Sequence, residues 1–400
     1  MKAIILAAGE GSRMRPLTYT RPKVMLPIAN KPILEHLLIE ASQAGIKEFI
    51  FVVGYCDEQV RDYFGKGGKW GVNIVYCNQR KQLGTADALR MAEGLVDGNF
   101  LVINGDIIVN QEDIKGLASK SDNTLSVIEV KDASNLGMVE LSKDGVVRIC
   151  EKVKKPPSRT ANAGLYLFTP DIFSAISQTS KSPRGEYEIT DSLQLLIDKG
   201  CPVSYHKINY WLDLSYPWDL LSANESLLAG IESQNSGEVE EGVVIKGVVS
   251  IDKNTVVRSG SYIVGPVTIG RNCEIGPNCY IRPYTAIGDG CHIGNAVEVK
   301  SSIIMKGAKI PHHNYVGDSV IGEKCNFGAG TKVANLRLDE KEIWVAGINT
   351  KRRKLGAIIG DRVETGINAS INVGSIIGNN TLIGPGAIAS GVILPDSRIF

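Results

Sequence analysis

Residues 263–294 read IVGPVTIGRNCEIGPNCYIRPYTAIGDGCHIG, and from Ile263 onward every sixth residue is isoleucine. The same period runs unbroken from Ile245 to Val299, and it resumes one residue out of phase at Ile304. Neither an α-helix, with 3.6 residues per turn, nor an alternating strand produces a six-residue period. A parallel β-helix does, because each coil is built from hexapeptides whose apolar residue points toward the coil axis. The sequence therefore predicts a parallel β-helix of hexapeptide repeats in the C-terminal half.

The N-terminal half has a different pattern, in which apolar strands alternate with amphipathic helices. AIILAAG (3–9) is followed by PILEHLLIEASQAGI (32–46), and EFIFVVGY (48–55) opens the next unit. Alternation of this kind is typical of a Rossmann-like α/β domain with a mostly parallel sheet. We therefore expect three parts: an α/β domain over 1–225, a helix and linker over 226–242, and the β-helix over 243–400. Residues 335–357 break the hexapeptide period and are predicted to form an inserted loop.

The composition excludes several classes of partner. The formal net charge is +1, so no global charge favours nucleic acid or a membrane surface. No apolar run approaches the roughly 18 residues of a membrane span. The eight cysteines are scattered and show no CxxC pair, which favours reduced thiols. We therefore expect a cytoplasmic protein that binds small molecules.

The first strand runs directly into LAAGEGSRMRPLTYTRPKVMLP (6–27). Gly9 and Gly11 let the backbone approach a phosphate closely, and Arg13 and Lys23 supply cations. The glycines alone would also fit a plain turn between a strand and a helix. The spacing G-x-G-x-R, with a lysine ten residues later inside R-P-K-x-M-x-P, is neither a Walker A loop nor a dinucleotide-binding G-x-G-x-x-G motif. It resembles the signature of the sugar-nucleotide pyrophosphorylases, which transfer a nucleotidyl group to a sugar 1-phosphate.

That resemblance assigns roles to further residues in the N-terminal half. It implies that Lys23 orients the attacking phosphate and Arg13 holds the leaving phosphates. It also implies that Mg²⁺ binds at Asp106 in INGD and Asp213 in YWLD. The implied nucleotide contacts are Leu6, Ala7, Ala8, Gly9, Gly11, Gln82, Gly84 and Thr85. The implied sugar-phosphate contacts are Gly137, Glu151, Lys152 and Asn162. Leu214–Ser215 stands where many thymidylyltransferases have Gly-Thr, which leaves the choice of UTP or dTTP open.

Five segments that depart from the plain hexapeptide pattern carry a second resemblance. They are YIRPYT (280–285), VEVKSS (297–302), IPHHNYVGD (310–318), CNFGAGT (325–331) and ANLRLDEK (334–341). In this order they resemble the acetyltransferase half of the bifunctional glucosamine-1-phosphate acetyltransferase/N-acetylglucosamine-1-phosphate uridylyltransferases, and more closely that of the archaeal relatives. The family implies a left-handed β-helix in which His312 is the general base. It also implies that the amino sugar and acetyl-CoA are bound by Arg282, Lys300, Tyr315, Asn326, Asn335 and Lys341.

The leading hypothesis is a bifunctional enzyme of UDP-N-acetylglucosamine biosynthesis that uses acetyl-CoA, UTP or dTTP, and Mg²⁺. The resemblance also implies a homotrimer, or a higher homo-oligomer, formed through the β-helix. The alternative is a monofunctional glucose-1-phosphate or mannose-1-phosphate nucleotidyltransferase whose β-helix only assembles and regulates. Other questions also stay open. They are the range of sugar phosphates accepted, the exact oligomeric state, the role of His313, the role of the basic cluster 351–354, and the effect on acetyl transfer of the short C-terminus and of Trp344, where relatives carry a lysine.

Overall fold

The computed structural model describes residues 1–131, 136–143, 145–151 and 158–400, and it divides into two compact units. The first unit comprises Met1–Glu10, Arg21–Met25 and Ile33–Asp213, and the second comprises Gly11–Thr20, Leu26–Pro32 and Leu214–Phe400. The second unit therefore holds two short N-terminal segments and helix α7 (Asp219–Leu228) together with the β-helix. In the described ranges, no helix is long and apolar enough to cross a membrane.

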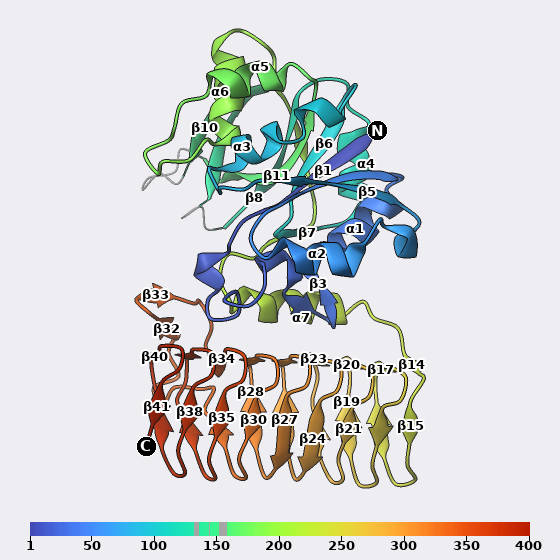
Figure 1. The fold of residues 1–400 in the computed structure, drawn as a ribbon, viewed down its shortest axis with the longest axis vertical. Helices are drawn as coiled ribbons and strands as arrows, with labels where there is room; N and C mark the ends of the chain where they lie inside the picture. The colour runs from blue at the N-terminus through green and yellow to red at the C-terminus, as the bar shows by residue number, and fades with distance from the viewer. Residues whose placement is uncertain (132–135, 144, 152–157) are drawn as a thin grey trace. The chain divides into compact units, whose positions relative to one another are not determined.

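The first unit is built on one mixed sheet with the strand order β10-β9-β11-β6-β1-β4-β5, and β8 joins β11 to β12. Four adjacent strands, ending in the edge strand β5, are parallel: β1 (Lys2–Ala7), β4 (Glu48–Val53), β5 (Asn73–Asn78) and β6 (Phe100–Asn104). The others are β8 (Thr124–Glu129), β9 (Gly137–Ser142), β10 (Gly145–Glu151), β11 (Thr160–Phe168) and β12 (Ser204–Lys207). The helices are α1 (Ile33–Gln43), α2 (Asp57–Phe64), α3 (Thr85–Arg90), α4 (Gln111–Ala118), α5 (Ile172–Gln178) and α6 (Ile189–Asp198), drawn in Figure 1.

Both faces of this sheet are buried, which explains why its strands read as continuous apolar runs. Ile5 and Ile103 pack into one buried cluster, whereas the neighbouring Ile4 and Val102 pack into a second cluster. The α/β prediction is confirmed. The parallel strands end on one edge, where β1 leads into the glycine-rich segment and β6 leads into Asp106.

The second unit contains a left-handed β-helix of three parallel sheets, here called faces 1, 2 and 3. Face 1 comprises β14 (Gln234–Asn235), β17 (Val249–Ile251), β20 (Val267–Ile269), β23 (Thr285–Ile287), β26 (Ile303–Ile304), β29 (Val320–Ile321), β34 (Ala357–Ile359), β37 (Ser375–Ile377) and β40 (Val392–Ile393). Face 2 comprises β15 (Glu238–Val239), β18 (Val256–Val257), β21 (Glu274–Ile275), β24 (His292–Asn295), β27 (Lys309–His312), β30 (Asn326–Phe327), β35 (Glu364–Thr365), β38 (Leu382–Ile383) and β41 (Arg398–Ile399). Face 3 comprises β16 (Val244–Lys246), β19 (Tyr262–Val264), β22 (Tyr280–Ile281), β25 (Glu298–Lys300), β28 (Tyr315–Gly317), β31 (Lys332–Val333), β36 (Ser370–Ile371) and β39 (Ile388–Ala389).

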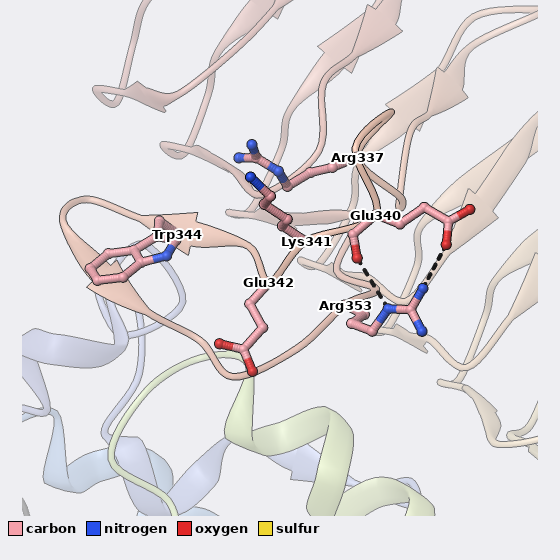
Figure 2. A pocket seen from close by; sticks show the side chains of 6 residues that line it. All are labelled: Arg337, Glu340, Lys341, Glu342, Trp344 and Arg353. Carbon is pink, nitrogen blue, oxygen red and sulfur yellow. Dashed lines mark hydrogen bonds and ion pairs between the residues drawn. The ribbon is translucent and has the colours of Figure 1, made fainter.

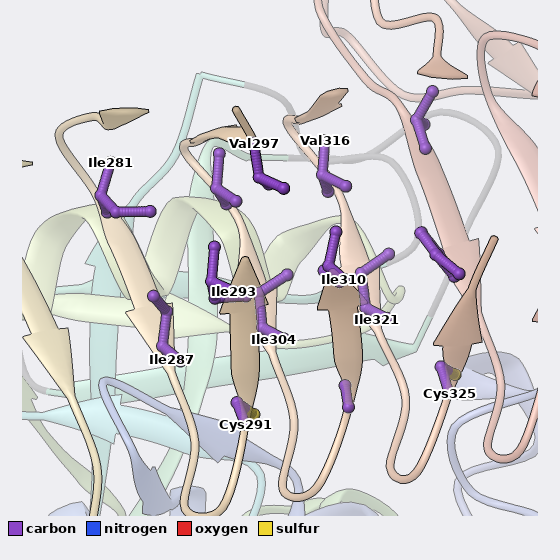
Figure 3. Packing of buried hydrophobic residues seen from close by; sticks show 14 of the residues in the cluster. Ile281, Ile287, Cys291, Ile293, Val297, Ile304, Ile310, Val316, Ile321 and Cys325 are labelled. Carbon is purple, nitrogen blue, oxygen red and sulfur yellow. The ribbon is translucent and has the colours of Figure 1, made fainter. Parts of the chain in front are cut away.

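The six-residue ladder fills the interior of the β-helix, as predicted. Ile281, Ile287 and Ile293 come from three different faces and are fully buried in one cluster, and Figure 3 shows their side chains pointing into the coil. Equivalent residues stack from coil to coil, as in the pair Ile263 and Ile281. All eight cysteines of the chain are free. Burial raises the pKa of the Cys291 thiol in this interior, so the thiol stays protonated.

The phase slip in the ladder has a local cause. The register pairs Ile263 with Ile281, whereas it pairs Val299 with Val316, so the second of these coils is shorter by a single residue. The missing residue falls in the turn from face 3 to face 1, and the next such turn is shortened in the same way. Each contains a non-glycine residue with positive φ: Ser301 (44°) and Asp318 (49°). These two shortened turns adjoin the residues predicted to bind the amino sugar.

The inserted loop leaves the coil after β31 and returns before β34, close to the predicted span of 335–357. It carries a two-stranded hairpin of β32 (Trp344–Val345) and β33 (Ile348–Asn349). Ile343 and Val345 are buried, and the Ile343 and Arg352 backbones are joined by a hydrogen bond of 2.9 Å. The loop is therefore an ordered hairpin with an apolar anchor.

Two candidate active sites

The first candidate site begins where β6 ends. The Lys23 Nζ donates to Asp106 Oδ2 at 2.6 Å, and the Lys23 side chain is only 9% exposed. Gly105 has no room for a side chain, because a Cβ there would lie 2.8 Å from the Leu6 carbonyl oxygen. The backbone before Asp106 therefore lies directly beside the end of β1, where the glycine-rich segment begins. Lys23 and Asp106 are far apart in the sequence, and the fold brings them together in one site.

The second predicted metal ligand lies beside the first. Asp213 ends β13 (Trp211–Asp213), which pairs with β7 (Ile107–Val109) so that Asp213 is opposite Ile107, the residue after Asp106. Among the described residues no cluster of three His, Cys, Asp or Glu side chains could hold a metal. A pair of carboxylates fits Mg²⁺, which takes its other ligands from water and substrate phosphates.

A buried carboxylate that the sequence did not single out positions Asp213. Asp113, in the first turn of α4, accepts backbone hydrogen bonds from Asn209 at 3.1 Å and Tyr210 at 3.0 Å. Those two residues precede β13, so Asp113 fixes the start of the strand that presents Asp213. No sequence signal marked Asp113, because an acidic residue in a first helical turn is common.

Three of the predicted nucleotide contacts, Gln82, Gly84 and Thr85, also have structural roles. A Cβ on Gly84 would lie 2.4 Å from the Tyr187 carbonyl oxygen, and Gly84 has a φ of 115°. The Thr85 Oγ1 accepts a hydrogen bond of 2.9 Å from the Ile189 backbone amide. The Gln82 Nε2 donates to the Ala8 carbonyl oxygen at 3.4 Å. The segment is therefore bonded both to the start of α6 and to the end of β1.

A buried glutamine that the sequence analysis missed supports this segment. The Gln79 Nε2 donates to the Gly84 carbonyl oxygen at 3.0 Å and to the Asp87 Oδ2 at 2.9 Å. Asp87 in turn pairs with Arg90 at 2.6 Å. Gln79 lies just before the predicted motif, so only its burial in the fold reveals its role.

The predicted sugar-phosphate residues lie on adjoining antiparallel strands. Gly137 is directly opposite Glu151 in the pairing of β9 with β10. Asn162 lies at a register shift in β11, where its Nδ2 donates to the Tyr166 hydroxyl at 2.8 Å and its Oδ1 accepts from the Gly164 amide. Lys152, predicted to contact the sugar phosphate, lies outside the described residues.

Gly9 belongs to the first unit and Gly11 and Arg13 belong to the second. A Cβ on Gly9 would meet nothing within 4 Å, so its backbone borders open space, and Gly11 is left-handed with a φ of 68°. The Arg13 guanidinium lies 5.6 Å from the centroid of the Tyr216 ring, which stacks on Trp218. This aromatic support was not predicted.

The second candidate site lies on face 3 of the β-helix. Arg282 pairs with Glu298 at 2.8 Å, and the Lys300 Nζ lies 3.0 Å from Asp318 Oδ2. The Asn335 Nδ2 donates to the same Asp318 oxygen. Four of the predicted residues, Arg282, Lys300, Tyr315 and Asn335, thus converge around two carboxylates that the prediction omitted. Burial, followed by the nearby Glu298 and Asp318 charges, raises the pKa of the Tyr315 hydroxyl.

His312 ends β27 on face 2, next to the corner that leads to β28. Its side chain is exposed, and its backbone carbonyl accepts from the Gly330 amide at 3.0 Å. His313 has a φ of 51°, and its carbonyl oxygen accepts a hydrogen bond from Lys332. The imidazole of His312 therefore faces solvent while the backbone of both histidines is fixed.

Asn326 is separated from the cluster on face 3. It lies on face 2 and pairs with Lys309, three residues before His312. At about 3.3 Å per residue, this places its backbone roughly 10 Å along the strand from His312. The coil does not bring Asn326 to Arg282 and Lys300.

Lys341 lies in the inserted loop, where a cavity of about 500 Å³ is lined by Arg337, Glu340, Lys341, Glu342, Trp344 and Arg353, drawn in Figure 2. Arg353 pairs with Glu340 at 2.7 Å, and Arg337 pairs with Asp339 at 2.8 Å. The hydrogen bond from Arg337 holds the pKa of the Asp339 carboxyl well below its usual range. Trp344 is 61% exposed. Arg337 and Arg353 are thus each paired with a carboxylate of the same loop.

Known proteins are similar to this chain over both units. Residues 2–230 match the nucleotidyl transferase family, and residues 263–367 match the GMPPB C-terminal domain. Over its full length the chain is 44% identical to the bifunctional protein GlmU of Methanococcus maripaludis, of which it covers 97%. The chain belongs to the bifunctional GlmU family.

Another relative is the bifunctional sugar-1-phosphate nucleotidylyltransferase/acetyltransferase of Sulfurisphaera tokodaii, 41% identical over 98% of this chain and 97% of the relative. Among solved structures, one described as a glucose-1-phosphate thymidylyltransferase from Bacillus anthracis is 30% identical and has a TM-score of 0.53. It covers 59% of this chain and 98% of its own. Similarity to the GlmU family therefore extends over the β-helix as well as the α/β unit.

Proposed function

We propose that the chain is a bifunctional enzyme of UDP-N-acetylglucosamine biosynthesis. The β-helix acetylates glucosamine 1-phosphate with acetyl-CoA, and the α/β unit transfers a uridylyl group to the product with release of pyrophosphate. The observation that carries this proposal is the group of Arg282, Lys300, Tyr315 and Asn335 on face 3, next to the corner that carries His312. A β-helix used only for assembly has no need of a lysine ammonium whose side chain is only 13% exposed, because such a charge is costly to desolvate.

Nucleotidyl transfer needs positioning and positive charge more than it needs a covalent intermediate. An oxygen of the sugar 1-phosphate attacks the α-phosphorus of UTP or dTTP, and the bond to the β,γ-diphosphate breaks. The nearly buried Lys23 orients the attacking phosphate, and Arg13 holds the leaving phosphates. Asp106 and Asp213 would hold Mg²⁺, which when bound neutralises charge on the phosphate oxygens.

Acetyl transfer requires removal of a proton from the amino group as its nitrogen attacks the thioester carbonyl. An imidazole exchanges protons near neutral pH, so the exposed His312 is suited to accept that proton. The carbon–sulfur bond then breaks and CoA leaves as the thiol. Lys300 and Arg282 bind the sugar phosphate, Tyr315 and Asn335 line its pocket, and Lys341 and Asn326 are assigned to substrate contacts.

We place the enzyme in the cytoplasm, where nucleoside triphosphates and acetyl-CoA are used, and we propose a homotrimer or a higher homo-oligomer formed through the β-helix. Leu338 is fully exposed and Trp344 is 61% exposed, both on the inserted loop. Large exposed apolar side chains favour burial against another copy of the chain.

The alternative, a monofunctional glucose-1-phosphate or mannose-1-phosphate nucleotidyltransferase, is less favoured because the bifunctional relatives align over both units. One pair of assays separates the two. Purified protein is incubated with glucosamine 1-phosphate and acetyl-CoA while free thiol is followed. Pyrophosphate is followed separately with UTP or dTTP and each sugar phosphate. Pyrophosphate release without any thiol release would favour the monofunctional alternative.

A further inference from the structure

Asp318 has an unusual position for an acidic residue. Only 5% of it is exposed, and it occupies a shortened turn with a φ of 49°, a left-handed conformation that other non-glycine turn residues of the β-helix share. A buried carboxylate is costly unless it is paired and hydrogen-bonded. Buried charges concentrate at functional sites, where surrounding contacts compensate the cost of burial.

Those contacts connect three separate parts of the acceptor site. The Asp318 Oδ2 lies 3.0 Å from Lys300 Nζ and also accepts from Asn335 Nδ2. The Asp318 backbone amide donates to the Lys300 carbonyl oxygen at 3.0 Å, and its own carbonyl oxygen accepts from the Gly356 amide at 2.8 Å. Asn335 lies where the chain enters the inserted loop, and Gly356 lies where it returns. One residue therefore fixes Lys300 and both ends of the loop.

The neighbouring residue leaves room for this arrangement. A Cβ on Gly317 would lie 2.7 Å from both the Tyr315 hydroxyl oxygen and the Asn335 Nδ2. Gly317 therefore allows Tyr315 and Asn335 to meet above the turn. Tyr315 and Asn335, both proposed acceptor ligands, share this space, and Asp318 accepts a hydrogen bond from Asn335.

The geometry leaves Lys300 available to a substrate. An ammonium has three N–H donors, and the contact with Asp318 uses one of them. The Lys300 side chain is 13% exposed, so few water molecules can stabilise its charge. Without the Asp318 carboxylate, the ammonium would lose the contact that fixes its position.

We propose that Asp318 is a positioning residue of the acetyltransferase site, holding Lys300 and Asn335 where they bind the phosphate and sugar of the amino-sugar acceptor. This inference rests on the proposed function of the β-helix. It assigns to Asp318 no contact with the reacting atoms, so its effect falls on acceptor binding. Donor binding and the chemistry of the α/β unit do not depend on it.

The test compares Asp318→Asn with Asp361→Asn, a matched control. Asp361 is also a buried carboxylate of the β-helix, 4% exposed, and accepts from the Glu323 amide. Thiol release gives KM for glucosamine 1-phosphate, KM for acetyl-CoA, and kcat. We expect Asp318→Asn to raise the acceptor KM at least about tenfold, the effect of one lost charge-assisted hydrogen bond. The donor KM stays within about twofold, and Asp361→Asn leaves both KM values within about twofold.

A double-mutant cycle with Lys300→Met separates positioning from general support. If Asp318 acts through Lys300, adding Asp318→Asn to Lys300→Met changes the acceptor KM by less than about threefold. Equal rises in both KM values, multiplicative effects in the cycle, or an unchanged acceptor KM would overturn the proposal. If Asp318→Asn does not fold, Asp318→Glu, which keeps the charge but displaces it, is expected to give the same acceptor-specific rise.

Different experimental results would reveal a failure of the proposed function and a failure of the role assigned to Asp318. If the wild type releases no thiol from acetyl-CoA, the proposed function fails, and the acceptor role of Asp318 fails with it. Urea unfolding of Lys300→Met, Asp318→Asn and the double variant still shows whether Asp318 holds Lys300. Additive losses of stability would contradict the pairing itself, and non-additive losses would support it.

Discussion

Asn314 gives the sharpest stability prediction, because its side-chain amide is buried in the histidine-bearing coil and has no hydrogen-bond partner among the described residues. It is 2% exposed, and among the described residues neither its Nδ2 nor its Oδ1 has a hydrogen-bond partner. It occupies the same coil position as Val297 and Thr331, since the residues that follow all three are paired in register. The interior at this position already accommodates valine. Asn314→Val is therefore expected to be tolerated and stabilising.

The neighbouring Thr331 provides a contrasting substitution of nearly unchanged shape. Its Oγ1 donates to the Gly328 carbonyl oxygen at 2.9 Å and lies 2.7 Å from the Thr365 hydroxyl. Removing an unpaired buried amide should raise the free energy of unfolding by about 1–3 kcal/mol, whereas losing the hydrogen bonds of Thr331 should lower it by about 1–2 kcal/mol. Asn314→Val and Thr331→Val should thus shift stability in opposite directions.

The assay is urea unfolding followed by circular dichroism at one protein concentration, since assembly makes apparent stability depend on concentration. Wild type, Asn314→Val and Thr331→Val are compared by their transition midpoints. A midpoint for Asn314→Val that falls as far as that of Thr331→Val would refute the reasoning. It would mean that the Asn314 amide is hydrogen-bonded in solution, for instance by a buried water.

Three further predictions concern the α/β unit. Gly84→Ala places a Cβ 2.4 Å from the Tyr187 carbonyl oxygen, at a residue whose φ is 115°. We therefore expect the free energy of unfolding, measured by thermal unfolding, to fall by more than about 2 kcal/mol, and pyrophosphate release to be impaired. Asp213→Asn should lower pyrophosphate release at least about 100-fold and leave thiol release unchanged, because one carboxylate of the proposed Mg²⁺ site is lost; equal losses in both assays would contradict this. Burial lowers the pKa of His206 in the folded state, so the unfolded state binds more protons and stability falls as pH drops through about 6.5. Between pH 7 and pH 5 the urea midpoint should therefore fall less for His206→Gln than for the wild type, and identical slopes would refute the assignment.

The sequence predicted the parts of the fold that depend on repetition. The six-residue ladder identified the β-helix, and a coil of three hexapeptides explains why Arg282 and Lys300 occupy equivalent positions on adjacent coils. Glu298 and Asp318 escaped notice because an acidic residue on a solenoid is usually solvated. Only the fold shows that Asp318 lies in a shortened turn beside Lys300.

Other parts of the sites depend on contacts between segments far apart in the chain. Gly84 and Thr85 were assigned to nucleotide binding, yet their observed contacts are with Tyr187 and Ile189, in a distant part of the sequence. Asn326 was grouped with the acceptor residues, although the coil places it on face 2. Local motifs identify such residues, but tertiary pairing decides which of them meet.

The most direct test of the account is His312→Ala assayed for both activities on the same preparation. The two activities are assigned to separate sets of residues, one including Lys23 and Asp106 and the other His312 and Lys300. Loss of a general base typically slows a reaction by about 10²–10⁴-fold. The account predicts that thiol release from acetyl-CoA falls by that factor while pyrophosphate release from UTP and N-acetylglucosamine 1-phosphate stays unchanged. Wild-type protein that releases pyrophosphate but no thiol would contradict the bifunctional assignment.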